Sequence, residues 1–516
     1  MAVKITDYML PMSDGARLCT RVIAPGDGRY PVVFQRTPYN ARAEITDDVI
    51  KSAENDQFIR HGYAVVFQCC RGCFGSEGEC IPYSPKERSD GLETIEWIRS
   101  LDCYNGELYF TGSSYTASVM LMLLNEPVEG LRGLAFSVQT ESMYHRNFYN
   151  GMCRTFCGFT WWLAMMAKDR PKIAEDKDIF VRPYKDIMKR AVGEDVPDFT
   201  EGLMQDRYGG VWKNDPRIGV IEKLDVPILL TGGWFDYYCY GMCSMWEKLR
   251  PETRARSAFL MTPFGHDLTY REGSDYPLSG GALPPDREAL WFDHVRLGVP
   301  FPYAADGAFR YYMTGENKWY NARSPYEIKP SEAFYLTAEG GMSASAPKGG
   351  ERSYIYDPEN PLHHELHDYM FLCDKENSHP DVLSYMSEPF TEDASYFGPV
   401  IFRLEASSDC DDTAFVFRLY LVEDGKSYNV IDGATTLLHA LGSYSAGERR
   451  SFEVVSQPTA FHVKKGARIR LDVSSFSDCY VPHANTAEHF ALAEKTRVAK
   501  NTVYGGESAV VLARKK

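Results

Sequence analysis

The first 300 residues alternate short apolar strands with stretches of helical spacing, and this alternation is the strongest constraint on the fold. Apolar runs that are typical of buried strands occur at residues 30–35, 63–68 and 108–111. Between the second and the third, residues 90–98 carry apolar side chains at helical spacing. Strands and helices in this alternation indicate a parallel sheet, whose ligands bind at the carboxyl ends of the strands. We therefore expect an α/β domain with its functional residues in the loops that follow the strands.

Further strands and a helix extend the same pattern. Residues 226–231 and 257–261 are again short and apolar, and residues 287–297 place apolar side chains on one helical face. Ahead of the first buried strand, residues 1–30 alternate short polar and apolar segments, which predicts an antiparallel pair of strands.

Two regions depart from this rhythm. Residues 142–219 give no strand signal and are rich in aromatic and methionine side chains, which favours a helical cap inserted over the sheet. From residue 309 onward the chain changes to short alternating strands broken by Gly, Pro and Asp, of which residues 309–313 are the first. About 200 residues of this kind predict an all-β sandwich. The expected division is an α/β domain formed by residues 1–141 and 220–308, a cap at 142–219 and a sandwich at 309–516.

One of the predicted strand ends carries the pattern of a nucleophile elbow. Strand 108–111 runs into Gly112-Ser113-Ser114-Tyr115, and an apolar helical run begins at Ala117. A sharp strand-to-helix turn holds the central serine in a strained backbone conformation and exposes its oxygen above the sheet. Free N–H groups at the start of the helix can stabilise an oxyanion. Ser114 is thus a candidate nucleophile, although Gly-x-Ser also occurs in ordinary tight turns.

Two more strand ends carry the residues that such a nucleophile needs. Strand 226–231 ends at Gly232-Gly233-Trp234-Phe235-Asp236, and strand 257–261 ends at Thr262-Pro263-Phe264-Gly265-His266. Ser114, Asp236 and His266 therefore follow sheet strands in the order that α/β-hydrolases use. In a triad of this kind the histidine takes the serine proton and the aspartate orients the imidazole. The sequence predicts that these three residues form a catalytic triad.

Composition excludes several classes of function. The formal net charge of −15 argues against a nucleic-acid partner, because nothing would neutralise phosphates. The N-terminus shows no secretory signal and no window approaches about 18 uninterrupted apolar residues, so we expect a cytoplasmic protein with no membrane partner. The thirteen cysteines lack the paired spacing of a structural zinc site and are expected to be free thiols.

A histidine-rich segment, His363-His364-Glu365-Leu366-His367, is the strongest candidate for a metal site. It lacks the zincin order, in which a glutamate directly follows the first histidine of an i, i+4 pair on a helix. Pro361 just upstream indicates a loop. We therefore predict no metal site and no cofactor.

Several short motifs together resemble the CocE/NonD-type serine hydrolases, which include X-Pro dipeptidyl-peptidases, bacterial cocaine esterase and α-amino acid ester hydrolases. The resemblance covers essentially the whole chain. The motifs are Arg36-Thr37-Pro38-Tyr39, Arg71-Gly72 with Gly75-Ser76-Glu77-Gly78, Asp90-Gly91 with Trp97, Gly112-Ser113-Ser114-Tyr115, Gly233-Trp234-Phe235-Asp236, Pro263-Phe264-Gly265-His266, Trp291-Phe292-Asp293-His294 with Gly298, and Asp381-Val382-Leu383 with Ser387-Glu388-Pro389.

The resemblance implies an α/β-hydrolase with a helical cap and a C-terminal jelly roll of the galactose-binding type. Ser114 would be the nucleophile, His266 the general base and acid, and Asp236 the group that orients the imidazole. The oxyanion would be held by the Tyr39 hydroxyl and by the N–H of Tyr115. Losing one donor of this kind typically raises the barrier by roughly 3 kcal/mol. Members of the family often form homo-oligomers, and a homodimer is one form compatible with catalysis.

The chain departs from the family pattern at three places. Ala117 stands where Gly is usual, at a close contact of helix and strand, and Cys69-Cys70 stands where an Asp usually precedes the Arg-Gly turn. Tyr237-Tyr238-Cys239 follows Asp236, where the amino ester hydrolases have carboxylates that bind a substrate ammonium. The last departure disfavours that branch of the family.

An aromatic substrate pocket is expected from Trp234, Tyr238, Phe264 and one of Trp161 or Trp162, and it would suit an apolar or aromatic acyl group. The expected reaction is a two-step acyl transfer that hydrolyses a small carboxylic ester or amide. Release of X-Pro dipeptides from short peptides is the alternative within the same mechanism. A third reading is an inactive hydrolase whose jelly roll binds carbohydrate or a partner.

Overall fold

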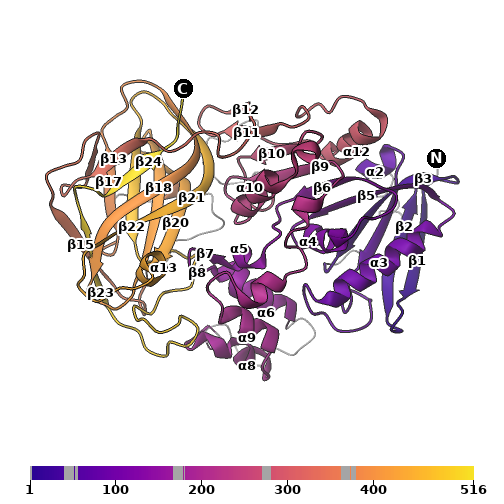
Figure 1. Cartoon of the computed structure of the whole chain (residues 1–516), viewed down its shortest axis with the longest axis horizontal. Helices are drawn as coiled ribbons and strands as arrows, with labels where there is room; N and C mark the ends of the chain where they lie inside the picture. Colours follow the sequence, from indigo (N-terminus) through magenta and orange to yellow (C-terminus); the bar gives the residue numbers. More distant parts are fainter. Residues whose placement is uncertain are drawn as a thin grey trace.

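The computed structural model describes residues 3–39, 56–166, 180–269, 281–361 and 379–516, together with residues 52, 178, 372 and 373. These residues form an α/β unit, a mainly helical cap and a C-terminal β domain. In Figure 1 the α/β unit is on the right, the cap is below the centre and the β domain is on the left.

Among the described residues, one sheet of ten strands forms the α/β unit. Every neighbouring pair from β4 to β11 is parallel, whereas β1 with β2, β2 with β4 and β11 with β12 are antiparallel. This is the mostly parallel α/β-hydrolase sheet that the sequence predicts, with the expected antiparallel pair at its N-terminal edge. The spatial order is β1 (Lys4–Pro11), β2 (Arg17–Ala24), β4 (Ala64–Cys69), β3 (Tyr30–Thr37), β5 (Tyr104–Ser113), β6 (Leu131–Ser137), β9 (Ile228–Gly233), β10 (Ala258–Thr262), β11 (Phe309–Met313) and β12 (Lys318–Ala322).

Helices cover both faces of this sheet. Pro85 starts the longest of them in the first turn, where its missing N–H leaves no bond unmade, and Gly298 ends another with a left-handed φ of 69°. The last helix has the bounds that the sequence predicts. The helices and short 3-10 turns of the unit are α2 (Gln57–Arg60), α3 (Pro85–Arg99), α4 (Tyr115–Leu121), η1 (Met122–Asn125), η5 (Ile221–Lys223), α10 (Cys239–Lys248), α11 (Pro251–Arg254) and α12 (Arg287–Leu297).

Burial on both faces explains why the strands are continuous apolar runs rather than alternating ones. In β3, Val32 and Phe34 belong to the core that α3, α4 and α10 share. Val33 points to the opposite face and packs with Phe58 of α2 and Phe292 of α12. Polar side chains are therefore left for the strand ends, where the candidate site lies.

The cap is mainly helical, as expected. Its hydrophobic cluster includes Phe148, Phe159 and Trp212 and extends to Val481 and Ala491 of the C-terminal region. It also contacts the β domain, since Thr155 N–H donates to Cys479 O at 3.0 Å. Its elements are α5 (Met143–Asn147), the short hairpin β7 (Phe148–Tyr149) and β8 (Met152–Cys153), a π-helical turn η2 (Thr155–Thr160), α6 (Trp161–Met166), η3 (Tyr184–Asp186), α8 (Ile187–Val192), α9 (Pro197–Leu203) and η4 (Gly210–Asn214).

The C-terminal region is an antiparallel β domain, with β14 and β17 as a parallel pair. Its short helix α13 (Leu437–Leu441) is capped by Thr436, whose side chain accepts from His439 N–H. Its strands are β13 (Glu332–Leu336), β14 (Gly341–Ser343), β15 (Glu351–Tyr356), β16 (Leu372–Cys373), β17 (Leu383–Ser387), β18 (Ala394–Ser408), β19 (Ala414–Glu423), β20 (Lys426–Thr436), β21 (Arg450–Val463), β22 (Arg468–Ser474), β23 (Ala499–Tyr504), β24 (Ala509–Leu512) and β25 (Arg514–Lys515).

Two strands differ from the sequence-based expectation. Strand β6 was not predicted, because Gly133 and Arg132 interrupt its short apolar run. Residues 309–313 were expected to begin the sandwich, and that assignment is wrong, since β11 pairs in parallel with β10 in the α/β sheet. An apolar strand has the same local pattern in either sheet, so the sequence could not tell which partner it has. The domain boundaries derived from the sequence stay a prediction.

The α/β unit and the β domain are joined by hydrogen bonds as well as by the chain. Thr314, just after β11, donates its N–H to Ala460 O at 3.2 Å and accepts from His462 N–H at 2.8 Å. Gln457 of β21 donates from Nε2 to the carbonyl of Trp234 at 3.1 Å. The β domain therefore supports the loop that follows β9.

Within the described part of the chain, no helix is long and apolar enough to cross a membrane.

Candidate active site

Ser114 lies in the sharp turn between β5 and α4. Its backbone angles, φ 57° and ψ −124°, fall in a region that residues other than glycine rarely adopt. Ser114 N–H donates to Ser137 O of the neighbouring strand β6 at 3.0 Å, and Ser118 N–H donates to the Ser114 carbonyl at 3.0 Å. The sheet and the helix therefore hold the turn from both sides, in the geometry of a nucleophile elbow.

This turn requires glycine at position 112. A Cβ atom there would lie 2.5 Å from Ala117 N and 2.8 Å from Ala117 Cα, so the backbone would have to move. The Thr116 hydroxyl accepts from Ser113 N–H and donates to Ser113 O, each at 2.6 Å, which ties the helix to the strand. Ala117 is fully buried. The close approach of α4 to β5 thus depends on Gly112, and the methyl group of Ala117 does not prevent this approach.

Asp236 is positioned by close contact between the loops after β9 and β10. A Cβ atom on Gly233 would lie 2.1 Å from Phe264 O, so this position requires glycine as well. Phe235 N–H donates to Phe264 O at 3.1 Å, and Asp236 N–H donates to Gly233 O at 3.2 Å. These bonds bring the two loops together and place Asp236 beside the residues that follow β10.

The three predicted triad residues form one hydrogen-bonded chain. His266 Nε2 lies 3.0 Å from Ser114 Oγ, and His266 Nδ1 lies 3.0 Å from Asp236 Oδ1. The Asp236 side chain is fully buried, whereas that of His266 is 24% exposed. Tyr237 stacks on the imidazole with ring centroids 4.6 Å apart and an interplanar angle of 22°. The histidine is therefore fixed in orientation yet open to a substrate.

The two predicted oxyanion donors flank Ser114. Tyr39 follows β3; its hydroxyl accepts from Trp161 Nε1 at 3.4 Å, and Tyr39 lines the same cleft as Ser114. Tyr115 supplies the first backbone N–H of α4. Desolvation raises the pKa of the Tyr39 phenol above its ordinary value, so the hydroxyl keeps its proton and can donate. A phenol and a backbone N–H are thus available to one oxygen next to Ser114.

A buried ion network lies under the elbow and connects three of the sequence motifs. The fully buried Arg36 places Nη1 3.0 Å from Glu87 Oε2, and Glu87 Oε1 accepts from Tyr115 OH at 3.1 Å. Asp90 lies 3.9 Å from Arg36 Nη2 and 2.6 Å from Arg71 Nη2. These residues therefore hold the helix that carries the Tyr115 N–H, rather than contact a substrate.

The cysteines that replace the usual aspartate before Arg71 belong to the same buried region. Cys69 and Cys70 are both buried, and burial raises the pKa of the Cys70 thiol well above its ordinary value. The thiol therefore stays neutral, and the twelve described cysteines are all free.

A cleft of about 750 Å³ lies beside Ser114. Its described lining includes Tyr39, Ser114 and His266, and it continues over Leu268 and Arg287 from the segments after β10 and at the start of α12. Its volume is within the usual range for small-molecule sites. The cleft gives a leaving group room next to the nucleophile.

Two of the five predicted pocket residues lie at this site. Trp161 contacts Tyr39 through the hydrogen bond described above, and its ring lies 5.6 Å from the Tyr115 ring between centroids. Tyr238 lies with its ring centroid 5.5 Å from that of His266. These rings form an aromatic wall beside Ser114, on the cap side.

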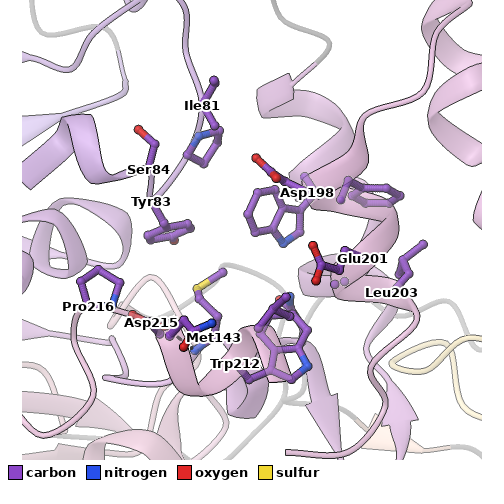
Figure 2. A pocket seen from close by; sticks show the side chains of 18 of the residues that line it. Ile81, Tyr83, Ser84, Met143, Asp198, Glu201, Leu203, Trp212, Asp215 and Pro216 are labelled. Atoms are coloured by element: carbon purple, nitrogen blue, oxygen red, sulfur yellow. Dashed lines mark hydrogen bonds between the residues drawn. The ribbon is translucent and has the colours of Figure 1, made fainter. Parts of the chain in front are cut away.

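Trp162 instead lines a second cavity, of about 350 Å³, between the cap and the segment before α3. Figure 2 shows Tyr83 and Pro216 on one side of this cavity, facing Asp198 and Glu201 on the other. Tyr83 also packs against Tyr115, with ring centroids 4.6 Å apart. The second cavity and the Ser114 cleft share no described lining residue.

The remaining two predicted pocket residues are placed in the protein core. Trp234 is 1% exposed; its ring packs on Phe309 and Tyr311, and its Nε1 donates to Tyr312 O at 2.8 Å. Phe264 is 2% exposed. Neither belongs to the described lining of either cavity. Strand β11, whose place in the α/β sheet was not predicted, covers the Trp234 ring. The expected role of both residues in substrate binding stays a prediction.

Arg146 of α5, which was not predicted as a site residue, lies at the same aromatic wall. Its guanidinium carbon lies 4.2 Å from the centre of the Trp161 ring, and its Nε donates to Tyr238 OH at 2.9 Å. A single arginine in an aromatic stretch gives no motif from which this placement could be inferred. The segment 363–367, considered above for metal binding, lies outside the described residues.

Two family models match the chain in succession. The model described as X-Pro dipeptidyl-peptidase (S15 family) matches residues 14–267, which include Ser114, Asp236 and His266. The model described as X-Pro dipeptidyl-peptidase C-terminal non-catalytic domain matches residues 305–510. Together they account for most of the chain.

Individual proteins agree with this assignment. The chain is 24% identical to the cocaine esterase of Rhodococcus sp. (strain MB1 Bresler), over 97% of this chain and 92% of that protein. It is 24% identical to the Xaa-Pro dipeptidyl-peptidase of Lactobacillus helveticus (strain DPC 4571), over 89% of this chain and 60% of that protein. The solved structure of an α-amino acid ester hydrolase has the same fold, with a TM-score of 0.86 at 22% identity over 100% of this chain and 97% of that one. The chain therefore belongs to the X-Pro dipeptidyl-peptidase (S15) family and is a serine hydrolase of the CocE/NonD type.

Proposed function

We propose that the protein hydrolyses carboxylic esters through an acyl-enzyme on Ser114. The observation that carries this proposal is the chain of two 3.0 Å contacts from Ser114 Oγ through His266 to Asp236. A hydroxyl becomes a nucleophile when a base within hydrogen-bonding reach takes its proton, and a third group must orient that base. His266 and Asp236 meet these two requirements.

In the first step, Ser114 Oγ bonds to the carbonyl carbon of the ester while His266 Nε2 takes the hydroxyl proton. The carbonyl oxygen becomes an oxyanion, for which the Tyr39 hydroxyl and the Tyr115 N–H are the donors. The bond to the alkoxy oxygen then breaks, and the imidazolium gives its proton to the departing alcohol. The Asp236 carboxylate stabilises the imidazolium between these two transfers.

In the second step, water attacks the carbonyl carbon of the acyl-enzyme while His266 takes a proton from it. The bond to Ser114 Oγ breaks, His266 returns the proton to the serine oxygen, and the acid leaves. The same two donors serve the second oxyanion. Each step needs only groups that lie within the described site.

Labelling and turnover test the proposal. A fluorophosphonate probe is expected to label Ser114, and a short-chain nitrophenyl ester is expected to be hydrolysed with an initial burst of nitrophenol. Ser114→Ala should abolish both, whereas Ser113→Ala is the matched control, because that serine lines the same cleft without contacting His266. Folded wild-type protein that takes no label would instead support the inactive scaffold with a binding β domain.

Release of X-Pro dipeptides remains the second candidate, because the matching family model carries that activity in its description. It uses the same triad but needs a group that binds the free N-terminal ammonium of a peptide. The described aromatic wall presents Arg146 at this point, and a cation disfavours an ammonium. Comparing an X-Pro anilide with the nitrophenyl ester separates the two candidates, and equal or better turnover of the anilide would reverse our ranking.

A further inference from the structure

Arg146 is a buried cation whose charge no described carboxylate balances. Its side chain is only 2% exposed. Its Nε donates to Tyr238 OH at 2.9 Å, and its Nη1 donates to Asn147 Oδ1 at 2.9 Å and to Cys157 O at 2.8 Å. All three acceptors are neutral. An uncompensated charge in a low-dielectric interior is expensive, and proteins nearly always pair it.

Among the described residues, the other arginines that are as fully buried as Arg146 are each paired with a carboxylate. Arg36 lies 3.0 Å from Glu87, and Arg217 pairs with Asp215 at 2.5 Å. For Arg146, no ion pair is formed within the described residues, and none of them accepts a hydrogen bond from Nη2. The N–H groups of Nη2 therefore have no acceptor among the described residues.

The position of this cation relates it to the reacting groups. On one side it stacks on Trp161, whose Nε1 donates to Tyr39 OH. On the other side it is bonded to Tyr238, whose ring faces His266. Arg146 is thus one side chain away from the oxyanion donor and from the general base. If the acyl group of an ester lies on this side of Ser114, the cleft over Leu268 and Arg287 would take the alcohol.

We propose that Arg146 binds a carboxylate on the acyl group of the substrate, so that half-esters of dicarboxylic acids are the preferred class. This inference rests on the proposed esterase reaction at Ser114 and specifies its substrate. The substrate carboxylate would accept hydrogen bonds from Nη2 and supply the missing negative charge. The methylene chain between the two carboxyl groups would lie along Trp161 and Tyr238, which explains an aromatic wall with a cation at its end.

The neighbouring sequence agrees with an anionic rather than a cationic acyl group. The residues directly after Asp236 are Tyr237, Tyr238 and Cys239, none of which carries a carboxylate. A charge-assisted hydrogen bond in a buried site is about twice as strong as a neutral one. Arg146 should therefore favour a carboxylate over an uncharged end group of the same shape, and reject an ammonium.

A series of nitrophenyl esters that differ only in end-group charge tests this inference. The anionic members are the half-esters of adipic, pimelic and suberic acid. The neutral members end in an isopropyl group of the same shape, and the cationic member is nitrophenyl aminocaproate. For the best chain length, kcat/KM should be roughly 10- to 100-fold higher for the anionic ester than for its neutral partner. The cationic ester should be the poorest of the three.

Variants of Arg146 test whether its guanidinium causes the preference for anionic esters. Arg146→Met should lower the ratio of kcat/KM for the anionic ester to kcat/KM for the neutral ester to about one or below. Arg146→Lys keeps the positive charge but lacks the planar guanidinium, and it should give an intermediate ratio. Both esters are measured on one preparation, so the ratio does not depend on the fraction of folded protein. Arg207→Met is the matched control, since this exposed cap arginine bonds Leu438 O of the β domain, and its ratio should equal that of the wild type.

If the Arg146 variants do not fold, the kcat/KM values of the wild-type protein for the ester series are sufficient to test the inference. A protein that takes the fluorophosphonate label and hydrolyses the neutral esters, yet shows no preference for any anionic ester, would overturn this inference and leave the esterase proposal intact. Absence of label and of all ester turnover would overturn both. Competitive inhibition by free adipate, stronger than by hexanoate, is expected as support independent of turnover.

Discussion

Replacing Ser114 by glycine is expected to stabilise the protein while it abolishes catalysis. The residue sits at φ 57° and ψ −124°, where a side chain costs of order 1–3 kcal/mol. Glycine has no Cβ and removes this strain, although its freer unfolded chain offsets about 0.4–1 kcal/mol of the gain. Ser114→Ala keeps the strain and loses the same hydrogen bond to His266, so it is the proper reference. The net difference should be about 1–2 kcal/mol in favour of Ser114→Gly.

Thermal unfolding of the two variants under identical conditions measures this difference. With an unfolding entropy of about 2.1 cal/mol/K per residue, a cooperative unit of roughly 500 residues should gain about 1–2 °C in midpoint temperature. The same change one residue earlier, Ser113→Gly, lies at the end of strand β5 and should lower the midpoint instead, because glycine destabilises a strand. Equal midpoints for Ser114→Gly and Ser114→Ala would refute the view that the elbow stores strain.

Three further predictions concern the groups around the elbow. Tyr39→Phe should lower kcat for ester hydrolysis about 100- to 1000-fold with little change in KM, as steady-state kinetics will show, because it removes one oxyanion donor. Because the pKa of Tyr39 is raised, its protonated donor form is present below that pKa and is lost only above about pH 10. The ratio of wild-type to Tyr39→Phe kcat should therefore stay constant between about pH 7 and about pH 9. A ratio that decreases between these two pH values would contradict the assignment of Tyr39 as an oxyanion donor. Glu87→Ala should cost about 3–5 kcal/mol in denaturant unfolding because it leaves Arg36 buried without its partner. Glu77→Ala, which breaks the exposed pair with Arg17, should cost much less.

The parts of the site that could be predicted from the sequence are those with local signals. Ser114, Asp236 and His266 each follow a short apolar strand, and parallel strands bring their carboxyl ends to one edge of the sheet. The glycines at positions 112 and 233 mark the close approaches that the turns need. The relative positions of these residues thus follow from strand order and turn chemistry, both of which can be inferred along the chain.

The parts that could not be predicted depend on contacts between distant segments. Arg146 has its place because Tyr238 and Trp161, which are remote in sequence, meet it in the folded protein. Trp234 looked like a pocket residue because it precedes Asp236, but its ring lies under β11, a strand expected in the other sheet. An aromatic residue beside a catalytic loop has the same sequence pattern whether it faces a substrate or the core, so only the packing decides.

The hydrogen bond from Gln457 to the carbonyl of Trp234 has a consequence for how this protein can be divided. Trp234 lies two residues before Asp236, so the position of that carboxylate depends on a strand more than 200 residues later in the chain. The C-terminal region is therefore no detachable module. Chimeras that exchange it between relatives will keep an intact active site only if the incoming strand supplies the same donor, and recombination breakpoints between β12 and β13 should be tolerated or rejected on that basis.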